Sequence, residues 1–187
     1  MKKLLILVAI LLVSSGSYAL DTAKPFRLKD YNNKERSLSD YNGAKFVVVM
    51  FIATRCPVSN AYNERMVQLQ NDYAKKGVVF LGINSNKEES VDEIRKHAKE
   101  HNFKFPVLKD VENVVADQFG ASVTPEIYVL NPEHKVLYHG RIDDSRRENE
   151  VTSNDLRTAL DELLSGKNIS NNVTKAFGCT IKRIDKK

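Results

Sequence analysis

An unbroken apolar run, Phe-Val-Val-Val-Met-Phe-Ile, fills positions 46–52, and the pair Cys56-Pro57 follows after three more residues. A continuous apolar run of this length is typical of a central strand that is covered on both faces of its sheet. Pro57 fits the first turn of a helix, because the N–H that proline lacks would have no intrahelical partner there. We therefore expect a buried strand, a short loop, and a helix whose N-terminus carries Cys56.

Cys56 is the candidate nucleophile. A cysteine at a helix N-terminus meets unpaired backbone N–H groups and the positive end of the helix dipole, and both favour thiolate over thiol. Arg55 adds a neighbouring positive charge. The alternative is a buried, unreactive cysteine, since free cysteines are commonly buried. The position at a strand end, among polar neighbours, favours the reactive interpretation.

The first residues have the pattern of an export signal. Lys2-Lys3 is followed by an apolar stretch over 4–13 and by Ser17-Tyr18-Ala19, which offers small residues at the positions that a signal peptidase reads. We expect a signal peptide over 1–19 and a periplasmic or secreted protein. The apolar stretch is shorter than the roughly 17–25 residues of a membrane span, so no stable membrane insertion is expected after cleavage.

The charge and motif content of the chain restricts the classes of ligand and partner that it is expected to bind. The chain after cleavage carries 27 basic and 24 acidic side chains, a net charge of +3. The charges are interspersed, which does not favour nucleic acid as a partner. There is no phosphate-binding glycine loop, and His97 and His101 lie in a stretch rich in Lys and Glu that is typical of a solvated helix face. No organic cofactor or metal is implied.

Cys56 and Cys179 are the two cysteines of the chain, and no C-x-x-C is present. In an oxidising compartment two thiols tend to pair. Phe177 and Ile181 flank Cys179 and indicate that the tail docks on the domain. Three arrangements stay open: a reversible redox disulfide, a stable structural disulfide worth roughly 4–5 kcal/mol for so long a loop, and two sulfurs that never meet.

The remaining pattern predicts one domain over 20–165 and a tail over 166–187. Because a strand–helix–strand start requires a parallel pair with a right-handed crossover, while a later hairpin supplies antiparallel strands, we expect a mixed α/β sheet with helices on both faces. The expected elements are a hairpin (26–28, 36–38), a strand (46–52), a helix (57–76), a strand (78–83), a helix (91–98), an edge-like strand (105–108), a helical turn (111–119), a hairpin (126–130, 135–139) and a helix (153–164).

The second hairpin gives a register. If it turns between Pro132 and Glu133, Pro125 lies opposite Gly140, and the residues just after Gly140 emerge at the Cys56 end of the sheet. Our hypothesis is that Arg141 stabilises a thiolate or binds an acidic group, with Asp143 orienting it. The alternative is a surface ion pair of little energetic weight.

This order of elements, with a cysteine ending the first central strand and an X-Pro beginning the third, resembles the thioredoxin fold. The chain is most similar to its redoxin and peroxiredoxin-like (AhpC/TSA-like) branch, and within it to exported redoxin-domain proteins. The segments that carry the resemblance are the hairpin entry, Cys56 to Tyr62, Thr124-Pro125-Glu126, Gly140 to Asp144, and Phe177 to Lys182. The resemblance implies that Pro125 is cis and faces Cys56, and that the backbone of Thr124 pairs with a peptide substrate.

The resemblance also bears on activity. Ser59 stands where thioredoxins have their second cysteine, Ala53 where peroxiredoxins have Thr or Ser, and Asn60 where copper-handling relatives have a second cysteine. We expect an exported antioxidant thiol–disulfide oxidoreductase in which Cys56 attacks oxidised protein thiols or a peroxide, Cys179 resolves the product, and an exported thiol partner supplies electrons. The alternatives are a two-cysteine peroxidase, a binding module with a structural disulfide and, last, a metallochaperone.

Overall fold

The computed structural model describes residues 21–185, so the predicted signal peptide over 1–19 lies outside the described residues. The strands are β1 (Arg27–Asp30), β2 (Glu35–Ser37), β3 (Phe46–Phe51), β4 (Val78–Asn84), β5 (Val107–Lys109), β6 (Val123–Thr124), β7 (Glu126–Leu130), β8 (Val136–Gly140) and β9 (Cys179–Thr180). The helices are α1 (Pro57–Asn60), α2 (Asn63–Ala74), α3 (Val91–Glu100), α4 (Val114–Phe119) and α5 (Asp155–Leu164), with short 3-10 turns η1 (Leu38–Tyr41) and η2 (Glu148–Glu150).

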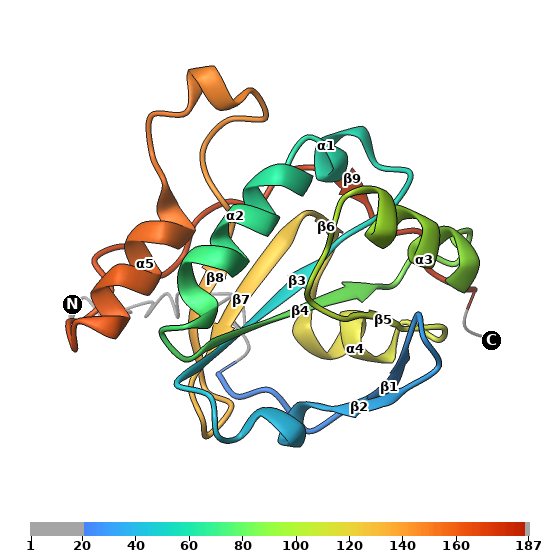
Figure 1. Cartoon of the computed structure of the whole chain (residues 1–187), viewed down its shortest axis with the longest axis horizontal. Coiled ribbons are helices and arrows are strands. Elements are labelled where there is room, and N and C mark those ends of the chain that lie inside the picture. Colours follow the sequence, from blue (N-terminus) through green and yellow to red (C-terminus); the bar gives the residue numbers. More distant parts are fainter. Residues whose placement is uncertain (1–20, 186–187) are drawn as a thin grey trace, which may run out of the picture.

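Seven strands form one mixed sheet in the order β2-β1-β5-β4-β3-β7-β8 (Figure 1). β3, β4 and β5 run parallel, whereas β7 and β8 continue the sheet antiparallel on the other side of β3. This is the predicted α/β architecture of a thioredoxin-like fold, with the added N-terminal hairpin β1–β2. The two-stranded pairing of β6 with β9 lies apart from the main sheet.

β3 is the centre of the core, as its apolar run predicts. Val48 and Met50 belong to a cluster with α2, α3 and α5, while Val47, Val49 and Phe51 belong to a second cluster with α4 and η1. Both faces of β3 are therefore covered, which is why every side chain of the strand can be apolar. Over residues 21–185, no helix combines the length and the hydrophobicity needed to cross a bilayer.

The single helix predicted over 57–76 is two helices. α1 ends at Asn60, and α2 starts after Tyr62. The N–H of Ala61, which caps α1, bonds to the carbonyls of Pro57 and Ser59. Both linking residues keep nearly helical dihedral angles, so the apolar spacing continues across the break. For this reason the sequence pattern does not reveal it.

Two details of the sheet also differ from the prediction. β5 is not an edge strand, because β1 of the N-terminal hairpin pairs with it. In the second hairpin Gly140 lies opposite Ile127, not Pro125. The turn spans five residues between Leu130 and Val136, and a β-bulge adds a further residue, so the predicted register was wrong by two positions.

Candidate active site

Cys56 caps the N-terminus of α1, with Pro57 at the first helical position as predicted. Its Sγ accepts a hydrogen bond from the Ser59 N–H at 3.2 Å. Cys56 is only 4% exposed. The strand, loop and helix therefore aim one backbone donor at a nearly buried sulfur.

The loop before Cys56 is held by a buried carboxylate that the sequence analysis missed. The Glu89 carboxylate accepts the N–H groups of Thr54 at 2.7 Å and Arg55 at 3.1 Å. The Asn84 amide, at the end of β4, donates to it at 2.6 Å. Since β3 and β4 are parallel, the segments that follow them lie at the same end of the sheet. This rule could have predicted from the sequence that Glu89 lies near the Cys56 loop. Glu89 acts here as a structural acceptor for the loop.

The Thr124–Pro125 peptide bond is cis, as the resemblance implied. Cys56 Sγ lies 3.3 Å from the Thr124 carbonyl oxygen, to which the thiol donates. The turn between β6 and β7 therefore faces the sulfur. A role for Thr124 and Pro125 in binding a peptide stays a prediction.

The C-terminal tail brings the second cysteine to the first. β9 pairs antiparallel with β6, and Cys179 stands opposite Thr124. The Cys179 side chain is within hydrogen-bonding reach of Cys56 Sγ. Both side chains are free thiols. The alternative in which the two sulfurs never meet is therefore wrong.

The tail docks through the apolar neighbours of Cys179, as predicted. The Phe177 ring packs edge-on against Tyr62, with 6.3 Å between ring centroids, and Ile181 is 3% exposed. Gly178 crosses the backbone of Thr124 so closely that a Cβ at this position would lie 1.9 Å from the Thr124 carbonyl oxygen. Glycine is thus a steric requirement for β9 to reach β6.

The two thiols differ in acidity. Burial raises the pKa of Cys56, but hydrogen bonds with the Cys179 thiol, the Thr124 side chain and the Ser59 N–H outweigh it, and the pKa lies below its ordinary value. Burial and the hydrogen bond with Cys56 raise the pKa of Cys179. The pair therefore favours the negative charge on Cys56 and the proton on Cys179.

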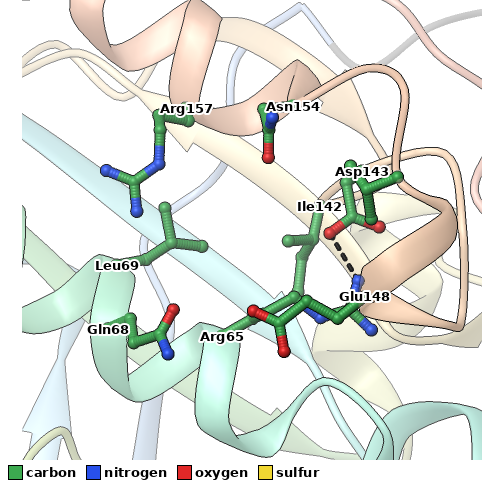
Figure 2. A pocket seen from close by; sticks show the side chains of 9 residues that line it. Arg65, Gln68, Leu69, Ile142, Asp143, Glu148, Asn154 and Arg157 are labelled. Carbon is green, nitrogen blue, oxygen red and sulfur yellow. Dashed lines mark hydrogen bonds and ion pairs between the residues drawn. The ribbon is translucent and has the colours of Figure 1, made fainter.

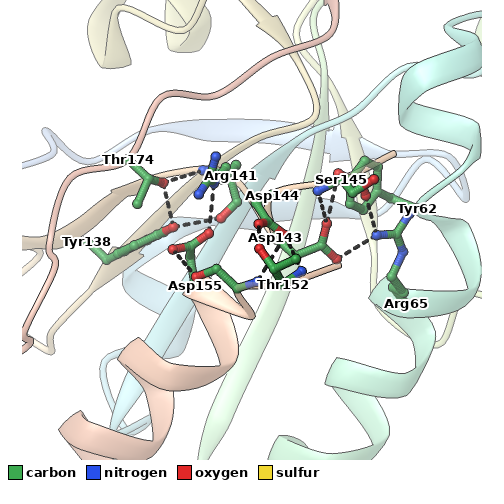
Figure 3. Close-up of polar contacts among 11 residues, drawn as sticks. Tyr62, Arg65, Tyr138, Arg141, Asp143, Asp144, Ser145, Thr152, Asp155 and Thr174 are labelled. Carbon is green, nitrogen blue, oxygen red and sulfur yellow. Dashed lines mark hydrogen bonds and ion pairs between the residues drawn. The ribbon is translucent and has the colours of Figure 1, made fainter. Parts of the chain in front are cut away.

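Arg141 and Asp143 do not form the predicted pair. The Arg141 Nε donates to Asp155 at the start of α5, at 2.7 Å (Figure 3). Asp143 pairs with Arg65 instead. Within residues 21–185, no hydrogen bond or ion pair joins Arg141 to Cys56. The predicted orientation of Arg141 by Asp143 was wrong, because Asp143 binds Arg65 and Tyr62 while Arg141 binds Asp155.

Arg65 is a buried cation that the sequence analysis missed. Its guanidinium, 7% exposed, lies 2.5 Å from Asp143 and donates to the carbonyl oxygens of Ser145 and Arg146 at 2.8 and 2.7 Å. It also stacks over the Tyr62 ring at 3.7 Å, and the Tyr62 hydroxyl donates to Asp143 at 2.9 Å. Figure 3 shows this cluster between α2 and the loop that precedes α5. The cluster fixes Tyr62, on which the tail packs.

Two cavities flank these residues. The first, about 230 Å³, lies beside Arg65, between α2 and the loop before α5 (Figure 2). The second, about 360 Å³, is lined by both cysteines. Its other lining residues are Ala53, Arg55, Asn86, Glu88, Glu89, Thr124, Thr180 and Lys182. Because both cysteines line it, the second cavity is the candidate active-site pocket.

The histidine pair does not extend into a metal site. The rings of His97 and His101 lie 4.4 Å apart and pack against Phe103. In the described part of the chain, no three His, Cys, Asp or Glu side chains are grouped so that they could hold a metal ion. The pair instead forms part of the packing at the end of α3.

Comparison with known proteins agrees with this geometry. The profile of the AhpC/TSA family matches residues 19–139, more than half of the chain. The chain belongs to the AhpC/TSA family. It is 30% identical to the thiol-disulfide oxidoreductase ResA of Bacillus subtilis (strain 168) over 125 residues, which are 67% of this chain and 66% of ResA. The chain thus spans just under two thirds of the length of this relative.

Two solved structures match nearly the whole chain. An uncharacterized conserved protein from Geobacillus kaustophilus is 34% identical, with a TM-score of 0.85 over 96% of this chain and 100% of its own. A hypothetical protein from Sinorhizobium meliloti 1021 is 33% identical, with a TM-score of 0.83 over 90% of this chain and 97% of its own. The whole architecture, and not the family domain alone, therefore recurs in other proteins.

The position that carries the second cysteine in thioredoxins is occupied by a serine in this chain. Ser59, where thioredoxins have their second cysteine, is buried and its hydroxyl accepts the Ala53 N–H at 3.2 Å. Cys179, which lies beyond the matched residues 19–139, is the cysteine that the structure brings near Cys56.

Proposed function

We propose that this chain is an exported thiol–disulfide oxidoreductase in which Cys56 attacks an oxidised sulfur and Cys179 resolves the product. One observation carries the proposal: two free thiols lie near each other on one pocket, with the charge favoured on the buried one at a helix N-terminus. Membership of the AhpC/TSA family and the similarity to ResA support this class of reaction.

The reduction of a disulfide runs in two steps. The Cys56 thiolate attacks one sulfur of the substrate disulfide, forms a mixed disulfide and releases the other sulfur as a thiolate. Cys179 then loses its proton to the departing thiolate and attacks Cys56 Sγ, which forms the Cys56–Cys179 bond and releases the second thiol. Two electrons pass from the protein dithiol to the substrate.

Regeneration by a partner dithiol begins at Cys179. Cys179 is partly exposed, whereas Cys56 is buried. A thiol with a lowered pKa is also the better leaving group, and this thiol is Cys56. Access and leaving-group acidity thus both select Cys179 for attack. The exported thiol reductant forms a mixed disulfide with Cys179 and releases Cys56 as a thiolate.

Export is part of the proposal because of the basic and apolar pattern of residues 1–19. A periplasmic or extracellular location would expose the two cysteines to an oxidising environment. Their pairing would then have to be reversed by a dedicated reductant for the protein to act as a reductase.

Stoichiometry with the aromatic disulfide 5,5′-dithiobis(2-nitrobenzoate) tests the proposed roles. Reduced wild-type protein is expected to release two thionitrobenzoate ions per chain and to end as the Cys56–Cys179 disulfide. Cys179→Ser is expected to release one ion and to keep the second as an adduct on Cys56, because no thiol remains to displace it. Absorbance and intact mass measure both quantities.

Cys56→Ser is the matched control, and we expect it to react at least about tenfold more slowly, since Cys179 has the raised pKa. Equal rates for the two serine variants would contradict the assignment of Cys56 as nucleophile. The peroxidase alternative predicts instead that hydrogen peroxide oxidises reduced wild-type protein faster than any disulfide does.

A further inference from the structure

The backbone edge beside Cys56 is already occupied. β6 uses its edge to pair with β9, through Val123 opposite Thr180 and Thr124 opposite Cys179. The Ile181 N–H extends this pairing to the Ser122 carbonyl at 2.9 Å. An extended substrate segment therefore cannot pair with this edge of β6 while the tail is docked.

The tail is also fastened beyond β9. The Lys182 N–H donates to the buried Asn86 side chain at 2.7 Å, and its carbonyl accepts the Lys87 N–H at 2.8 Å. Two residues later, the Ile184 N–H donates to the side chain of Asn113, which is fully buried, at 2.7 Å. These bonds hold the wall of the active-site pocket in place.

Displacing the tail would undo the proposed chemistry. Cys179 belongs to β9, so a protein segment that replaced β9 on β6 would carry Cys179 away from Cys56. The mixed disulfide would then lack its resolving thiol. A substrate that reacts by both steps must reach Cys56 with β9 in place, and the pocket of about 360 Å³ that both cysteines line offers such a route.

The rim of this pocket carries separated charges. The Lys182 ammonium forms no ion pair with any carboxylate of residues 21–185, although its backbone is fixed by the two bonds above. Glu88 lines the same pocket, also without an ion-pair partner in that range. Arg55, in contrast, is paired with Glu93. The pocket thus offers an unpaired cation on Lys182 and an exposed, unpaired carboxylate on Glu88, while the buried Glu89 carboxylate binds the loop N–H groups.

We infer that the substrate is a low-molecular-weight disulfide of zwitterionic, amino-acid-sized thiols, such as cystine, bound with a carboxylate toward Lys182 and an ammonium toward Glu88. This inference rests on the proposed function and specifies its substrate class. The volume lies near the lower end of the roughly 300–1,000 Å³ of ligand pockets, which suits a molecule of this size. Cys56 attacks one cystine sulfur and releases cysteine, and Cys179 releases the second cysteine as the protein disulfide forms.

Stopped-flow oxidation of the reduced protein by three disulfides tests the inference: cystine, neutral 2-hydroxyethyl disulfide, and insulin as a protein disulfide. Cystine is expected to react fastest. Lys182→Gln is expected to lower the second-order rate constant with cystine by about three- to five-fold, the size of one exposed ion pair, and to leave that with 2-hydroxyethyl disulfide unchanged. Lys175→Gln, an exposed tail lysine that does not line the pocket, is the matched control and is expected to match wild type.

Two results would overturn the inference. Faster oxidation by insulin than by cystine would show that the docked tail does not keep protein segments away from Cys56. Equal effects of Lys182→Gln on both small disulfides would show that Lys182 does not recognise charge. Neither result touches the proposed function, which instead fails if none of the three disulfides oxidises Cys56.

Discussion

Arg65→Ala is expected to lower the free energy of unfolding by about 3–5 kcal/mol, as for other buried ion pairs from which one partner is removed. The substitution would leave Asp143, which is 2% exposed, without its cation, and would free the carbonyl oxygens of Ser145 and Arg146. It would also remove the guanidinium that stacks on Tyr62. Urea unfolding followed by circular dichroism measures the change.

Arg157→Ala is the matched control. Arg157 lines the same cavity as Arg65 (Figure 2) but pairs with Asp72 at the surface, with both side chains substantially exposed. Its loss is expected to cost about 0–1 kcal/mol. A cost for Arg65→Ala no larger than that for Arg157→Ala would show that the buried cluster does not stabilise the fold in the way its geometry indicates.

Gly178→Ala is expected to slow formation of the Cys56–Cys179 disulfide by about 100-fold, the cost typical of displacing a reacting group by about 1 Å. The added methyl group would lie 1.9 Å from the Thr124 carbonyl oxygen, and neither atom belongs to a flexible side chain. β9 must therefore shift, and Cys179 with it. To measure the rate of disulfide formation, a small disulfide is added to the reduced protein, the reaction is quenched with acid at set times, and the Cys56–Cys179 bond is mapped by mass spectrometry.

Alkylation of Cys56 by iodoacetamide distinguishes a shifted tail from an unfolded protein. In folded Gly178→Ala, Cys56 keeps its Ser59 N–H donor and is still expected to react as a thiolate. Gly43→Ala is the control, since an added Cβ there meets no atom within 4 Å. An unchanged rate of disulfide formation in Gly178→Ala would mean that Cys179 reaches Cys56 without the β6–β9 pairing.

Local patterns predicted much of the fold and the nucleophile. The apolar run of β3 and Pro57 located Cys56 at a helix N-terminus, because both signals act within a few residues. The family resemblance correctly implied the cis bond before Pro125. Phe177 and Ile181 indicated a docked tail, although no local pattern specified that it docks on β6.

Interactions between distant segments were beyond sequence reasoning. The hairpin register was wrong because turn length and a β-bulge are not visible in the alternation of apolar and polar residues. The pairing of Arg141 with Asp143 was wrong because each binds a residue of another element, Asp155 or Arg65. Arg65 was missed because a charged residue beside an apolar helix face usually extends into solvent. Its burial depends on the loop at Ser145, 80 residues away in sequence.

A reversible disulfide between Cys56 and Cys179 is central to the proposed function, and its reduction potential tests it most directly. The protein without residues 1–19 would be equilibrated in glutathione and dithiothreitol buffers of graded potential, with thiols trapped and both cysteines mapped by mass spectrometry. We predict one Cys56–Cys179 bond with a potential between about −120 and −270 mV, the range of working oxidoreductases. A potential below about −300 mV, typical of a structural disulfide, or two free thiols in every buffer, would contradict it.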